Sequence, residues 1–211
     1  AVASRAELSK FKTVSNYDPA LEDNAEFEKL IDALPSLYPE VFRVCTLTRF
    51  PDRGLLFKWS GKDSSLNPGV LMAHYDVVPV NEELWTHPAF EGEISDGIMW
   101  GRGTLDTKLT VNGILFAANS LIQKGFTPQR DLYFAFSGGE EVSGMGAVHI
   151  VNWFKENNVT LEYVLDEGGG VVQDVFPGVK GECALIGIAE KGLMNLKFTV
   201  KSPGGHASAP L

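Results

Sequence analysis

The sequence predicts an α/β fold, in the form of a three-layer sandwich with a largely parallel central sheet. Short and evenly apolar runs at residues 70–73, 131–136 and 161–165 are typical of buried strands. Helical patterns lie between these runs, and the alternation of strands with helices favours parallel pairing. With 211 residues, of which 44% are hydrophobic, the chain is long enough to bury a substantial core.

Two helices are expected before the first buried strand. Residues 2–11 have a mixed pattern that favours a helix. Asp23 and Glu26 have the spacing of a capping box, and apolar residues at helical spacing follow them. Proline lacks the N–H group that a helix interior needs, so Pro35 and Pro39 are expected to end this second helix.

Several further strands are expected, two pairs of them as hairpins. Strands at residues 41–48 and 55–59 flank a Pro-Asp-Arg-Gly turn. An Asp-Gly dipeptide joins two shorter strands within residues 91–100, and this dipeptide is a frequent hairpin turn. Later apolar runs predict strands at 184–189 and 193–200.

Two more helices are expected in the middle of the chain. An apolar helix over residues 111–122 should end at Gly125, because glycine readily adopts the left-handed conformation that closes helices. A helix over residues 145–156 follows the second buried strand, and it is expected to turn inward Val148, Val151, Trp153 and Phe154.

Composition restricts the kinds of partner. The net charge of −9 and the sequence pI of about 4.9 argue against a nucleic-acid surface and an anionic membrane surface. No run approaches the ~20 apolar residues of a membrane-spanning helix, so a soluble protein is expected. Cys45 and Cys183 lie far apart and indicate no disulfide framework, which leaves both a cytoplasmic and a secreted location open.

Chemically active side chains follow each of the three buried strands. His74 and Asp76 come after the first strand, Glu140 and Glu141 after the second, and Asp166 after the third. The carboxyl ends of parallel strands meet at one edge of a sheet, so these groups are expected to converge there.

Divalent metal ions would relieve the repulsion among so many carboxylates. His74 and Asp76 are two residues apart and share one face, so the carboxylate can accept a hydrogen bond from one imidazole nitrogen and leave the other for a metal. Mixed imidazole and carboxylate ligands suit Zn²⁺, with Mn²⁺ and Co²⁺ as alternatives. Asp106, at the start of a helix beside this cluster, is able to join two such ions.

A series of short motifs also runs through the last two thirds of the chain. In their order along the chain, these motifs resemble those of the M20 family of metallopeptidases. Within this family, the resemblance is to the branch of Gly-X carboxypeptidases and N-acyl-amino-acid hydrolases. The resemblance implies a zinc exopeptidase-like fold and is weak before residue 70. Its motifs lie at residues 74–80, 85–90, 96–97, 101–108, 140–141, 166–169, 190–192 and 205–208.

The resemblance implies a site with two Zn²⁺ ions. His74, Asp106 and Asp166 would hold one ion, and Asp106 would bridge to the second, which Glu141 also holds. Such a site would cleave an amide bond adjacent to a free carboxylate by a zinc-bridged water, in a small peptide or an N-acyl amino acid.

Further roles follow from the same resemblance. Glu140 would be the general base, Asp76 would orient His74, and His206 would stabilise the tetrahedral intermediate from the lid domain. The peptide bond after Asp106 would be cis. Gly139 departs from the family, because an aspartate commonly precedes the paired glutamates, and this departure is expected to affect how Glu140 is oriented.

The resemblance also predicts a division into domains. Residues 1–190 would form the catalytic domain, and residues 191–211 would begin an α+β lid domain, which in the intact protein is able to form a homodimer. The family's last metal-binding histidine would lie beyond Leu211. The 211-residue chain by itself is therefore expected to be inactive and poor in metal.

Two other functions compete with the metallopeptidase. Ser137 follows a buried strand and partly resembles the nucleophile of a serine hydrolase, although the first glycine of that motif is absent. A metal-binding fragment without catalytic competence is the alternative that is not an enzyme.

Overall fold

The computed structural model describes residues 1–189, 192, 194 and 196–199 of the chain. The chain divides into two compact units, Ala1–Glu167 and Gly168–Leu211. The predicted domain boundary after residue 190 falls on residues outside the described part, so it stays a prediction. Among the described residues, no helix combines the length and the apolar character needed to cross a membrane.

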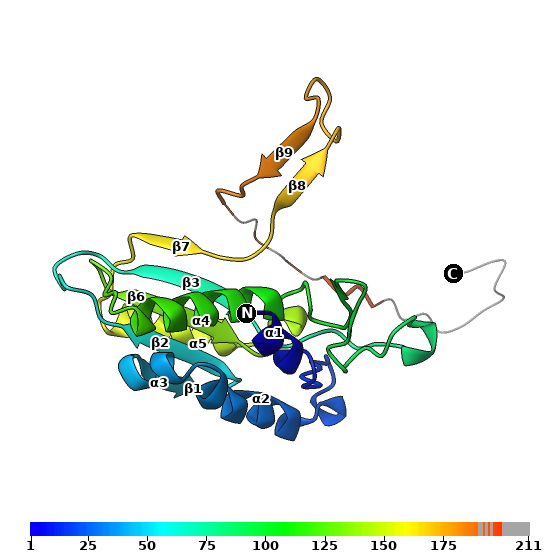
Figure 1. Cartoon of the computed structure of the whole chain (residues 1–211), viewed down its shortest axis with the longest axis horizontal. Helices are drawn as coiled ribbons and strands as arrows, with labels where there is room; N and C mark the ends of the chain where they lie inside the picture. Colours follow the sequence, from blue (N-terminus) through cyan, green and yellow to red (C-terminus); the bar gives the residue numbers. More distant parts are fainter. Residues whose placement is uncertain (190–191, 193, 195, 200–211) are drawn as a thin grey trace. The chain divides into compact units, whose positions relative to one another are not determined.

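The first unit is built on a five-stranded sheet with the strand order β1-β2-β6-β3-β7 (Figure 1). The strands β6, β3 and β7 are parallel to one another, and the β1–β2 hairpin completes the sheet at one edge, with β2 antiparallel to β6. This arrangement confirms the predicted α/β sheet. The strands are β1 (Thr46–Phe50), β2 (Gly54–Trp59), β3 (Gly69–His74), β6 (Leu132–Ser137) and β7 (Tyr163–Leu165).

Helices of two kinds accompany the sheet. The α-helices are α1 (Val2–Leu8), α2 (Asn24–Leu37), α3 (Pro39–Val44), α4 (Lys108–Gln123) and α5 (Gly146–Glu156). Short 3₁₀ turns are η1 (Pro19–Leu21), η2 (Glu82–Leu84) and η3 (Glu140–Val142).

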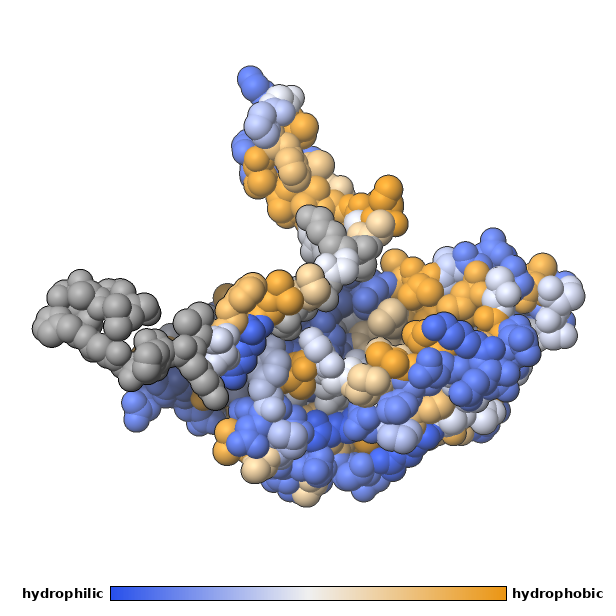
Figure 2. Space-filling model, turned by 180° about the vertical axis from the view of Figure 1, so that it is seen from behind, coloured by the Kyte–Doolittle hydropathy of each residue, from blue (hydrophilic) through white to orange (hydrophobic). Residues whose placement is uncertain are grey.

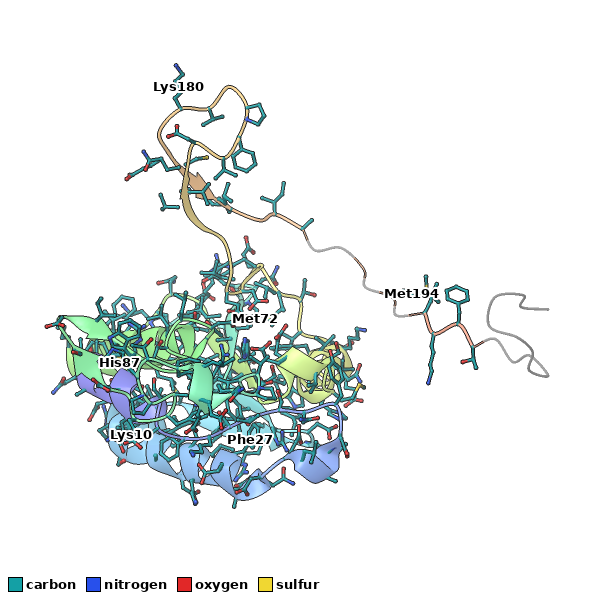
Figure 3. The ribbon with its side chains drawn as sticks, turned by 90° about the vertical axis from the view of Figure 1, so that its right-hand side faces the viewer. Lys10, Phe27, Met72, His87, Lys180 and Met194 are labelled. Carbon is teal, nitrogen blue, oxygen red and sulfur yellow. The ribbon has the colours of Figure 1, made fainter. Side chains whose placement is uncertain are left out.

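The strand β6 shows why the fold has three layers. Its alternate residues Phe134 and Phe136 point into a core shared with helices α1 to α4, while Tyr133 and Ala135 pack with α5 on the opposite face. Figure 3 shows Phe27 of α2 inside this unit. Because both faces of β6 are covered, its uniformly apolar sequence is explained.

The prediction of a strand at residues 41–48 is wrong over its first half. Helix α3 occupies residues 39–44, and only then does β1 begin. Pro39 is suited to a first helical turn, and the side chain of Asn119 in α4 accepts a hydrogen bond from the backbone N–H of Glu40 at 2.8 Å. Packing against α4 thus overrides the strand preference of the β-branched residues.

Helix α2 begins and ends differently from the prediction. The Asp23 side chain caps the N–H of Ala25, but Glu26 does not complete a capping box, because its carboxylate accepts from the N–H of Lys12 instead. The helix also runs through Pro35 to Leu37, since Leu34 remains anchored in the core. Pro35 therefore does not end the helix, whereas the helix does stop before Pro39.

Helix α5 has the expected bounds within one residue but a different inner face. Phe154 is buried as predicted, whereas Val148 and Val151 are 41% and 48% exposed. The residues that face the sheet are Ile150 and Phe154, four apart. Strand β7 is likewise exposed along its length, so the third predicted strand is not buried in the described structure.

Local turn signals were reliable. Strands β4 (Ile94–Ser95) and β5 (Ile98–Met99) form the expected short hairpin, with positive φ at Asp96 and Gly97. Helix α4 is followed by Gly125 at a φ of 77°, as predicted.

The second unit contains a hairpin of strands β8 (Gly170–Gln173) and β9 (Glu182–Leu185). Figure 2 shows apolar side chains exposed on this hairpin, and Figure 3 places Lys180 in the loop that joins its strands. Strand β8 was not predicted, because it begins within a run of glycines. The strand predicted at 193–200 lies partly outside the described residues, and those described there carry no strand.

We expect Leu115→Ala to lower the free energy of unfolding by about 2–5 kcal/mol, because this α4 side chain is completely buried. Leu121→Ala is the matched control, since Leu121 lies in the same helix and is 40% exposed. It should cost about 1 kcal/mol or less. Denaturant unfolding of both variants in the full-length protein tests this, and equal losses would contradict the assigned core.

Candidate metal centre

The candidate site lies where the parallel strands end. His74 is the last residue of β3, Glu140 begins η3 directly after the Gly-Gly that follows β6, and Glu167 follows β7. Asp106 lies in the loop before α4 and meets the same point. The carboxyl edge of the sheet therefore brings together side chains that are far apart in sequence, as expected for an α/β fold.

His74 lies at the centre of this group and is buried. Its Nε2 atom is 3.0 Å from Asp106 Oδ1 and 3.1 Å from Glu167 Oε1. Its Nδ1 atom is 3.1 Å from the backbone oxygen of Asp76 and 3.3 Å from Oδ1 of the same residue. Burial disfavours the charged imidazole, but the hydrogen bond and charge of Asp76 and the charges of Glu167 and Glu140 raise the pKa of His74 to about 10.

Three side chains form a group able to hold a divalent metal ion. One ligand atom from each of His74, Asp106 and Glu167 lies within 4.8 Å of the others. An imidazole with carboxylates is a donor set suited to zinc and related ions. The raised pKa of His74 shows that the surrounding acids favour a positive charge at this point, which a bound cation would also provide.

The carboxylate of Asp76 is completely buried and is held by several donors. Oδ1 accepts the backbone N–H of Glu140 at 3.1 Å, and Oδ2 accepts that of Glu141 at 3.1 Å. Oδ2 also accepts the hydroxyl of Ser15 at 2.7 Å. Burial by itself would raise the pKa of Asp76, but hydrogen bonds from His74, Ser15 and Glu140 lower it, so the carboxylate is charged.

The paired glutamates point to different parts of the site. Glu140 Oε2 is 3.8 Å from His74 Nε2, while Glu141 and Asp106 line a cavity of about 290 Å³. Burial raises the pKa of both glutamates, and neighbouring carboxylates, Asp76 and Asp106 among them, add to this effect. With glycine at position 139, the backbone N–H of Glu140 donates to Asp76. A Cβ added at Gly139 would meet only ordinary van der Waals contacts.

The structure brings Glu167, and not Asp166, to His74. The Asp166 carboxylate instead accepts the N–H of Glu167 at 2.8 Å and is exposed. Two adjacent acids point to opposite faces of an extended chain, so the register of β7 against β3 selects one of them. The adjacent pair was the only signal in the sequence. His206, predicted in the lid domain, lies outside the described residues.

Ser15 is a second residue at the site that sequence reasoning missed, and no local signal pointed to it.

Ser137, by contrast, lies buried at the end of β6 and hydrogen-bonds no histidine among the described residues. His87 and His149 are paired with acids elsewhere, at 3.0 and 2.8 Å. The peptide bond after Asp106 is cis, as the resemblance implied.

Comparison with known proteins agrees with this geometry. The family model for peptidase family M20/M25/M40 matches residues 70–210. A probable carboxypeptidase S-like 2 of Dictyostelium discoideum is 40% identical over 211 residues, which cover 97% of this chain and 41% of that protein. The N-fatty-acyl-amino acid synthase/hydrolase PM20D1 of Homo sapiens is 44% identical over 155 residues, covering 74% of this chain and 31% of that protein.

Solved structures support the fold. Human carnosine dipeptidase 1 matches with a TM-score of 0.66 at 16% identity, over 82% of this chain and 40% of that one. The chain thus spans less than half the length of the relatives it matches. Because the family model covers most of the chain, including the segments that carry His74, Asp106 and Glu167, the chain belongs to peptidase family M20/M25/M40.

Proposed function

We propose that the full-length protein is a metal-dependent hydrolase that cleaves an amide bond adjacent to a free carboxylate. The observation that carries this proposal is the placement of His74 Nε2 between the carboxylates of Asp106 and Glu167, with Glu140 at 3.8 Å. The names of the relatives, a carboxypeptidase and an N-fatty-acyl-amino acid synthase/hydrolase, support this substrate class.

His74, Asp106 and Glu167 would hold one ion, for which zinc fits the donor set, and Asp106 would be shared with a second ion held by Glu141. When bound, such ions polarise the scissile carbonyl and lower the pKa of the attacking water. Asp76 contacts the Nδ1 atom of His74, and this contact fixes the direction in which Nε2 points.

Glu140 is suited to move the proton. Its raised pKa favours proton transfer near neutral pH, and its backbone is held by Asp76. The carboxylate would take a proton from the water that attacks the carbonyl carbon. It would then give that proton to the leaving amine nitrogen as the carbon–nitrogen bond breaks, so the products are a free acid and an amine.

We expect the full-length protein to hydrolyse N-acyl amino acids or dipeptides with a free carboxylate, and to lose about tenfold or more in kcat/KM when that carboxylate is amidated. Loss of a charged hydrogen-bonding group accounts for such a factor. Chromatographic detection of the released amine measures it. Equal rates on both forms would contradict the proposal.

A chelator and a serine-directed phosphonate separate this proposal from the serine hydrolase. The metal-dependent mechanism predicts loss of activity with the chelator and no effect of the phosphonate. The opposite pattern would favour Ser137.

We expect Glu140→Gln to keep the metal content and to lower kcat by roughly 10²-fold or more, because the general base is lost. Glu141→Gln is its matched partner, and it should lower the metal content. Elemental analysis beside steady-state kinetics tests both variants. Near-normal turnover in Glu140→Gln would show that the roles are assigned incorrectly.

We expect Glu167→Gln to weaken metal binding by more than the roughly 10–100-fold that is typical for outer partners of a metal site. Asp166→Asn is the control, because the Asp166 carboxylate accepts the backbone N–H of Glu167 and does not contact His74. The metal affinity of this variant should stay close to that of the wild type. Competition with a chromophoric chelator measures both affinities. The reverse order of effects would restore Asp166 as the ligand.

A further inference from the structure

We propose that Ser15 is a positioning residue of this site, and that its hydroxyl holds the carboxylate of Asp76 in the orientation that the site requires. The Ser15 hydroxyl donates to Asp76 Oδ2 at 2.7 Å, the shortest contact that this carboxylate makes. Both side chains are buried, with 1% and 0% of their surface exposed. The effect on turnover rests on the proposed function, whereas the effect on metal affinity does not.

The segment that carries Ser15 is attached to the chain around Asp76. The N–H of Val77 donates to the backbone oxygen of Thr13 at 2.9 Å, and the N–H of Ser15 donates to that of Val77 at 3.1 Å. The Thr13 hydroxyl also donates to the backbone oxygen of Tyr75 at 2.6 Å. Ser15 is therefore fixed in place by the backbone on both sides of its acceptor.

Neighbouring buried hydroxyls show that this contact is unusual. Ser9 and Thr13 are also completely buried, but each donates to a backbone carbonyl. Ser15 donates to a charged carboxylate, and hydrogen bonds to charged groups are stronger than those between neutral groups. Ordinary satisfaction of a buried serine does not require an acceptor of this kind.

The carboxylate that Ser15 holds connects three parts of the site. Its two oxygens accept the N–H groups of Glu140 and Glu141 and lie against the Nδ1 side of His74. Without the Ser15 hydroxyl, Oδ2 keeps only the longer bond to Glu141, so the carboxylate loses its shortest hydrogen bond and is held less firmly. Rotation of this carboxylate would shift the general base, a metal ligand and the imidazole together.

Ser15 also lies outside the part of the chain that the family model matches, which begins at residue 70. The N-terminal segment thus supplies a contact to the site that the matched motifs do not contain.

The test is Ser15→Ala in the full-length, metal-loaded protein. We expect metal affinity, measured by chelator competition, to fall about tenfold, and kcat to fall by a similar factor with little change in KM, as is typical for outer partners of a metal site. Ser9→Ala removes an equally buried hydroxyl away from the site and should change neither quantity. Ser15→Thr keeps the hydroxyl and should restore both, whereas Ser15→Val should not.

Wild-type metal affinity and kcat in Ser15→Ala would overturn the proposal, and so would equal losses in Ser15→Ala and Ser9→Ala. If Ser15→Ala does not fold, the Ser15→Thr and Ser15→Val pair decides, and equal behaviour of the two would overturn it. Should the wild type hydrolyse none of the amide substrates, the proposed function fails. Chelator competition then still decides the role of Ser15.

Discussion

The buried charge of Asp76 is the constraint on which the rest of the site depends. A carboxylate without solvent is costly unless donors surround it, and all the donors here except His74 come from segments that are distant in sequence. His74 ends a strand, Glu140 and Glu141 begin a turn after another strand, and Ser15 belongs to the N-terminal segment. Satisfying this one group therefore draws three segments of the chain to the same edge of the sheet.

The same site concentrates negative charge around a single imidazole. The acids that face His74 raise its pKa, and Glu140 and Glu141 bind their own protons more readily than free glutamate does. Burial is the main cause for the two glutamates and opposes the effect on His74, but the crowding of carboxylates raises the pKa of all three groups. A divalent cation would supply positive charge among these carboxylates, and this explains why the geometry and the metallopeptidase motifs agree.

The sheet explains how much of the fold was predictable. Strand β6 is covered on both faces, so its apolar run was recognisable, and the turns at Asp96 and Gly125 carry their own backbone preferences. Helix α3 and the inner face of α5 were not predicted correctly. Their conformation is selected by α4 and by the sheet, which are contacts that no short window of sequence contains.

By itself, the sequence determined the type of chemistry: imidazole and carboxylate groups at the ends of parallel strands, in motifs of one peptidase family. Only the tertiary structure decided which of the adjacent acids Asp166 and Glu167 meets His74, and that Ser15 reaches Asp76. The physical reason is range. Side-chain type and turn preference are local, whereas strand register and the docking of a distant segment depend on packing across the whole unit.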